Sequence, residues 1–220
     1  MSVDKKSNYG MNKRPMSLIE EIFNAIIHGI GALLSIAGLV IVVVLAAKVK
    51  NPYAIVSSAI YGATLILLYI SSTLYHSFPE SRVKNLFKIF DHSAIYLLIA
   101  GSYTPFALVP LRGPWGWSLF GVIWGLAILG ILFKVFFVHR FNFISTIIYL
   151  LMGWLIIIAI KPLFASIPHI AAVFLILGGL AYTLGTVFYM FDKIFFFHII
   201  WHFFVLAGSI FHFFSIINIF

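Results

Sequence analysis

The sequence predicts an all-α, polytopic membrane protein: a seven-transmembrane-helix bundle with its N-terminus inside and its C-terminus outside. Of its 220 residues, 63% are hydrophobic and only 9% are charged, whereas a soluble domain carries about 25% charged residues. Too few polar groups are available to cover a soluble core of this size. The hydrophobic residues also form seven runs, each close to the about 20 residues that cross a hydrocarbon core as a helix.

The seven runs predict seven helices in order along the chain. They cover residues 23–47, 54–77, 88–109, 116–137, 142–161, 168–190 and 195–218. Prolines between or at the edges of the runs separate them, because proline interrupts a helix interior; these are Pro52, Pro79, Pro110, Pro114, Pro162 and Pro168.

The first run is predicted to remain in the protein as a transmembrane helix. It is too long for a cleavable signal peptide, Glu20 and Glu21 directly precede it, and six more spans follow. Residues 1–22 then form a polar cytoplasmic tail, and residues 23–220 form the transmembrane domain.

Small residues in the fourth and sixth runs predict close helix packing. Gly121 and Gly125 are four residues apart in the fourth run, and Gly178 and Gly179 are adjacent in the sixth. Small residues on one helix face allow another helix to approach closely.

The basic residues predict the orientation, because lysine and arginine concentrate in cytoplasmic loops. Ten of the 14 lie in the N-terminal tail and in the loops that follow the second, fourth and sixth runs. The net charge of +8 is therefore attributed to contact with anionic lipids, and no nucleic-acid partner is expected. The absence of cysteine excludes thiolate chemistry and cysteine-bound metals.

The most informative pattern is His198-x-x-x-His202 within the last run. Residues four apart lie on one face of a helix. Ionisable side chains are costly inside a membrane, so two of them on one face indicate a function. A shared metal ion is the simplest physical explanation.

Two further ionisable residues are predicted at the same depth. His76 lies at the inner end of the second run, and Asp91 lies near the inner start of the third. Separately, each has an ordinary explanation, as an interfacial histidine or as a carboxylate near a helix N-terminus. Their agreement in depth with His198 and His202 favours one metal site.

The predicted ligands are His76, His198 and His202, with Asp91 binding directly or through water. Three histidines leave a fourth position for water on zinc, as in catalytic sites. No carboxylate stands between His198 and His202, so Asp91 is the candidate base. Ser72 shares a helix face with His76 and would hydrogen-bond a ligand, a water, an oxyanion or its own backbone.

Other polar residues near the predicted site have open roles. Glu21 and His28 fall near the inner end of the first run. They are either supporting residues of the site or, equally, an entry-turn carboxylate and a packing histidine. His212 is ten residues beyond His202, about 15 Å along a helix axis, and is not expected to join the site.

Several separated motifs resemble the haemolysin III family, the bacterial branch of the progestin and adiponectin Q receptor family. They are Ser72-x-x-x-His76, the segment from Asp91, Gly101-Ser-Tyr-Thr-Pro-Phe106, His198-x-x-x-His202, and the opening Glu-Glu-Ile-Phe-Asn-Ala-Ile-Ile-His28. The resemblance implies seven membrane helices and a zinc site near the cytoplasmic side. His76, His198 and His202 match the zinc ligands, Asp91 the acidic residue that meets zinc through water, and Ser72 the motif serine.

The resemblance also implies an activity. The wider superfamily includes alkaline ceramidases, which implies a zinc-dependent hydrolase of a lipid amide with membrane lipids as partners. The haemolysin III name implies pore formation instead, and a sensor or regulator with a structural zinc is a third possibility. Short loops resemble the bacterial branch, so the expected location is the bacterial plasma membrane.

Overall fold

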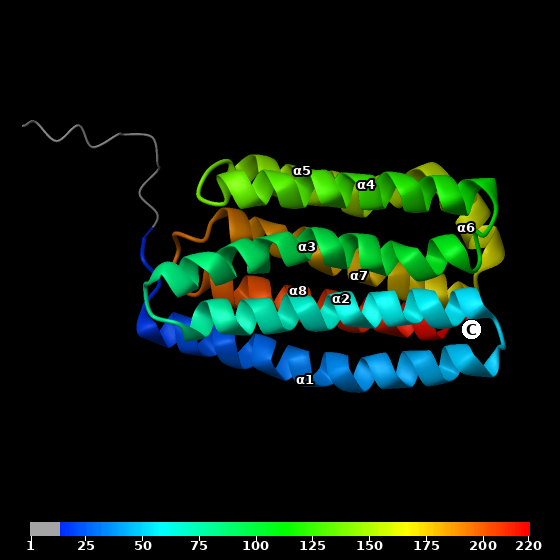
Figure 1. Ribbon diagram of the computed structural model, residues 1–220, viewed down its shortest axis with the longest axis horizontal. Helices are drawn as coiled ribbons and strands as arrows, with labels where there is room; N and C mark the ends of the chain where they lie inside the picture. Colours follow the sequence, from blue (N-terminus) through cyan, green and yellow to red (C-terminus); the bar gives the residue numbers. More distant parts are fainter. Residues whose placement is uncertain (1–13) are drawn as a thin grey trace, which may run out of the picture.

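The computed structural model describes residues 14–220, which form helices and connecting loops and contain no strands. The prediction of a polar tail at residues 1–22 falls mostly outside the described residues. The helices are α1 (Leu18–Lys48), α2 (Pro52–Ser77), α3 (Arg82–Leu108), α4 (Pro114–Phe137), α5 (Asn142–Trp154), the 3-10 helix η1 (Leu155–Ala159), α6 (Ile160–Ser166), α7 (His169–Met190) and α8 (Phe197–Ile217). The long helices lie side by side, and α1 begins at the end of the bundle opposite to the C-terminus (Figure 1).

Within residues 14–220, six helical segments are long and apolar enough to cross a membrane. They are α1, α2, α4, the continuous segment Asn142–Ser166, α7 and α8. Large hydrophobic side chains cover their outer faces; Leu33, for example, is 70% exposed and Leu129 64%. A lipid environment is the one in which such a surface is stable, so the predicted membrane class is confirmed. Helix α3 is also long, at 27 residues, but it carries several charged residues near its start.

The helices form a ring with one helix outside it. Helix α1 packs against α2 and α8, α2 packs against α3, and α7 packs against α5 and α8. A contact between α3 and α5 closes the ring, and α4 packs outside on α3 and α5. The interior of this ring is where a functional site can be shielded from lipid.

Helix α1 begins earlier than the hydrophobic run predicts. It starts at Leu18 rather than residue 23, after an N-cap at Ser17. Ser17 and Glu20 form a capping box, in which each side chain bonds the backbone N–H of the other residue. Glu20 and Glu21 therefore belong to the first turn of the helix instead of preceding it.

The predicted fifth helix is interrupted. A 3-10 segment, Leu155–Ala159, separates α5 from α6. The hydroxyl of Tyr103 satisfies backbone groups at this break: it accepts a hydrogen bond from the Ile156 N–H at 2.9 Å and lies 2.8 Å from the Met152 carbonyl oxygen. A polar side chain from α3 thus replaces helical hydrogen bonds that apolar surroundings would leave unmade.

Pro162 does not separate two helices as predicted. It is the third residue of α6, where its missing N–H costs little because first-turn N–H groups have no helical acceptor. The chain continues to Ser166 before the next turn.

The predicted glycine packing is only partly correct. A Cβ built on Gly121 or Gly125 would meet nothing within 4 Å, so this pair does not pack against another helix. A Cβ on Gly178 would collide with the ring of His212, which shows a close approach of α7 and α8. Gly179 has only ordinary van der Waals contact, at 3.9 Å.

Candidate metal centre

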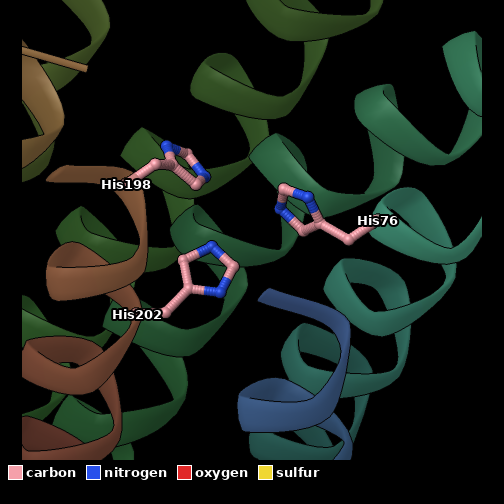
Figure 2. Close-up of side chains that lie close together, drawn as sticks. All are labelled: His76, His198 and His202. Atoms are coloured by element: carbon pink, nitrogen blue, oxygen red, sulfur yellow. The ribbon is translucent and has the colours of Figure 1, made fainter. Parts of the chain in front are cut away.

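Three histidines from two helices converge inside the bundle. His76 comes from the last turn of α2, and His198 and His202 come from the first two turns of α8. Figure 2 shows the three imidazole rings facing a common space. Their candidate ligand atoms all lie within 4.8 Å of one another. The structure therefore brings together the three histidines that the sequence singled out.

The three rings are packed closely and away from solvent. Ring centroids lie 4.7 Å apart for His198 and His202, 4.9 Å for His76 and His202, and 5.3 Å for His76 and His198. None of the three residues is more than 8% exposed. This pattern of burial and mutual approach is unusual for histidines that only fill space, because buried polar groups need partners.

The donor set fits a metal ion. Neither Nε2 of His76 nor Nδ1 of His202 has a hydrogen-bond partner among the described residues, although both atoms are buried. The nitrogens of a tetrahedral zinc site lie about 3.3 Å apart, given Zn–N distances near 2.0 Å. The candidate ligand atoms, which all lie within 4.8 Å of one another, are close enough to hold one ion.

Asp91 and Ser72 lie beside the histidine cluster rather than within it. Among the described residues, the group that can share one metal contains only the three histidines. The Ser72 hydroxyl is buried and has no hydrogen-bond partner among the described residues. Asp91 and Ser72 also line the cavity into which His198 and His202 face.

This cavity occupies the interior of the helix ring. The site residues line one end, and the remainder of its wall is mostly apolar, including Leu98, Phe106 and Phe164. Along α8 its lining extends from His198 to His212, about 21 Å of helix axis. That is more than half of the about 30 Å hydrocarbon thickness of a bilayer.

The comparisons with known proteins agree with these features. Residues 16–213 match the family described as Haemolysin-III related. The chain belongs to the haemolysin III family. It is 51% identical to Hemolysin-3 of Bacillus cereus over 94% of both chains. It is 53% identical to the Hemolysin-3 homolog of Bacillus subtilis (strain 168) over 90% of this chain and 93% of that one. A human protein, monocyte to macrophage differentiation factor, is 30% identical over 73% of this chain and 69% of its own.

Membership of the haemolysin III family, together with the six apolar segments, identifies a multi-pass integral membrane protein. The matched residues include four of the predicted site: His76 on α2, Asp91 on α3, and His198 and His202 on α8. The family resemblance drawn from the sequence is therefore confirmed.

In this haemolysin III protein, the first helix also contributes to the site. The Glu21 carboxylate accepts a hydrogen bond from Nδ1 of His76 at 2.6 Å and forms an ion pair with Lys84 at 2.9 Å. The His28 ring stacks on the His202 ring with a centroid distance of 3.7 Å. The sequence left the roles of Glu21 and His28 open, although polar residues spaced three and four apart on the apolar first helix indicated a buried polar face. The role of Lys84, on α3, was not predicted.

Two further histidines, His212 and His169, lie apart from the cluster. His212 contacts Tyr182 and Gly178 further along α8. His169 is the first residue of α7 and is exposed. Neither belongs to the group that can share a metal among residues 14–220.

Proposed function

We propose that this protein is a zinc-dependent hydrolase of a lipid amide bond, with a ceramide-like substrate. The observation that carries the proposal is a cluster of three buried histidines, two of which line a long, mostly apolar cavity together with the carboxylate of Asp91 and the hydroxyl of Ser72.

Zinc is the metal that best suits the donor set. His76, His198 and His202 would hold it through imidazole nitrogens, and three protein ligands are typical of catalytic zinc sites. When bound, zinc would polarise a carbonyl group and make a water molecule more acidic. Each ligand would have to offer an unprotonated imidazole nitrogen.

Asp91 and Ser72 would perform the proton transfer and the charge stabilisation. The Asp91 carboxylate is the acidic group on the cavity wall beside the histidines, so it would accept the proton of the attacking water and later return it to the leaving amine. The Ser72 hydroxyl would donate a hydrogen bond to the oxygen that becomes negatively charged when the amide carbonyl is attacked.

The shape of the cavity supports a lipid as substrate. His198, His202, Asp91 and Ser72 line the cavity near one end and its wall is mostly apolar, so an amphipathic molecule could place its amide at the histidines and a chain along the ring interior. Membrane lipids would enter the cavity from the surrounding bilayer.

The topology proposed for this function has seven crossings, with α3 as the additional one. Charged residues near the start of α3, including Lys84 and Asp91, would lie at the inner surface and at the site rather than in lipid. The N-terminal side of α1 would be cytoplasmic, and the bilayer would be the bacterial plasma membrane.

Activity and zinc content of the purified protein in detergent test the proposal. We expect release of the free amine and fatty acid from a ceramide, measured by mass spectrometry, and loss of both zinc and turnover in His198→Ala. The matched control is His169→Ala, which changes an exposed histidine at the other end of the bundle and should keep both. Turnover that survives complete removal of zinc would refute the proposed mechanism.

Two other functions give different outcomes in the same preparations. The relatives in Bacillus carry the name Hemolysin-3, but the mostly apolar cavity wall does not offer a polar path for ions. A pore would release dye from liposomes at protein concentrations that bind zinc, and we expect no release. One zinc per chain without turnover of any lipid amide would favour a sensor or regulator with a structural zinc.

A further inference from the structure

We propose that one face of α1 positions the metal-binding histidines and that Glu21 on this face selects the nitrogen that His76 offers. The face consists of Glu21, Asn24 and His28, which are separated by three and four residues and so point the same way. This inference rests on the proposed metal site, and it assigns positioning roles to residues that do not themselves bind the metal.

The bond between Glu21 and His76 determines which nitrogen is free. A carboxylate is an acceptor, so at 2.6 Å from Nδ1 it requires the proton to be on that nitrogen. Nε2 of His76 is then the unprotonated nitrogen, and it has no hydrogen-bond partner among residues 14–220. Carboxylate–histidine pairs of this kind fix the tautomer and the orientation of metal-binding histidines.

Glu21 is itself held in place from two directions. Its second oxygen is 2.9 Å from Nζ of Lys84, which also donates to the Phe78 carbonyl oxygen at 3.0 Å, where α2 ends. The ammonium group lies 5.0 Å above the ring of Tyr75. The carboxylate therefore joins the start of α1, the end of α2 and the start of α3.

The same face of α1 restrains His202. The rings of His28 and His202 are nearly parallel, with an angle of 15° and a centroid distance of 3.7 Å. In this arrangement the face of the His28 ring covers one face of the His202 ring. This stacking limits the tilt of the His202 ring.

Zinc affinity of the full-length protein tests this role directly. We expect Glu21→Ala to weaken zinc binding about 10- to 100-fold, the effect of losing such a supporting contact, measured by competition with a chromophoric chelator. Glu21→Gln should lose less, because its amide oxygen still accepts from Nδ1. The control is Glu80→Ala, an exposed glutamate in the loop between α2 and α3, and it should bind zinc as the wild type does.

A second measurement reads the tautomer without metal. In ¹⁵N-histidine NMR spectra of the metal-free protein, we expect His76 to carry its proton on Nδ1 in the wild type and in Glu21→Gln, and a mixture of tautomers in Glu21→Ala. If the alanine variant does not fold, the wild-type spectrum decides the matter, because a His76 proton on Nε2 would contradict the role of Glu21.

The outcomes separate this inference from the function on which it rests. Wild-type protein without zinc affinity would overturn both. Wild-type binding that is unchanged in Glu21→Ala, or a His76 proton found on Nε2, would overturn the positioning role alone and leave the proposed hydrolase intact.

Discussion

Replacing Glu20 with alanine should destabilise the protein and loosen its metal site. The Glu20 side chain is only 1% exposed, and its buried carboxylate accepts four hydrogen bonds. They come from Arg14 Nη2 at 2.6 Å, from the N–H and hydroxyl of Ser17 at 2.9 Å each, and from the Phe196 N–H at 3.0 Å. Phe196 is the residue before α8, so this carboxylate ties the start of α1 to the helix that carries His198 and His202.

The magnitude follows from these contacts. The pair with Arg14 is partly solvent-exposed and contributes about 0.5 kcal/mol. The capping interaction at Ser17 is worth about 1 kcal/mol, and loss of the acceptor for the Phe196 N–H costs about 1 to 2 kcal/mol. Together, Glu20→Ala should lower the free energy of unfolding by about 3 kcal/mol, with zinc bound more weakly because α8 is less well positioned.

Denaturant unfolding in detergent, followed by tryptophan fluorescence, measures this change. Glu80→Ala is the control, since it removes an exposed glutamate at the same end of the bundle and should alter the free energy of unfolding little. A loss below about 0.5 kcal/mol in Glu20→Ala, the scale of an ordinary surface substitution, would show that the link between α1 and α8 does not stabilise the fold.

Three further outcomes are expected. Gly101→Ala should cost about 1 to 3 kcal/mol of unfolding free energy, because its Cβ would collide with the buried Thr64 side chain, whereas Gly121→Ala should be neutral or slightly stabilising; equal effects would contradict this packing. Tyr103→Phe should destabilise by about 1 to 3 kcal/mol in the same assay, since it leaves backbone groups at the α5 break unsatisfied; a neutral result would mean that the break needs no polar partner. Zinc at a thousandfold excess over Kd should raise the unfolding free energy of the wild type by about 4 kcal/mol and leave His202→Ala unchanged, and an equal gain in both would place the metal elsewhere.

The order and approximate positions of the helices could be predicted, because the length of a hydrophobic run is a strong signal for a membrane helix. Each of the seven runs corresponds to a helical segment, but α1 and α3 begin five and six residues earlier than predicted and the fifth run is interrupted at Leu155–Ala159. Errors arose where polar contacts decide the structure. The start of α1 at Leu18 depends on the Ser17 cap, and the break after Trp154 depends on the Tyr103 hydroxyl, which is distant in sequence.

The histidine cluster was predictable for a related reason. Ionisable residues are rare in membrane helices, so their depth along each helix restricts which of them can meet. Depth does not reveal the rotation of a helix about its axis, which decides whether Glu21 faces His76 or solvent. It also does not show whether glycines such as Gly121 and Gly125 face a helix or lipid, and there the prediction was wrong.

X-ray absorption spectroscopy of the purified wild-type protein, combined with metal analysis, tests the metal centre most directly. We expect one zinc per chain, with three histidine nitrogens at about 2.0 to 2.1 Å and one oxygen ligand. Protein that contains no zinc after supply of the metal, or zinc that keeps the same surroundings in His202→Ala, would contradict a site built from His76, His198 and His202.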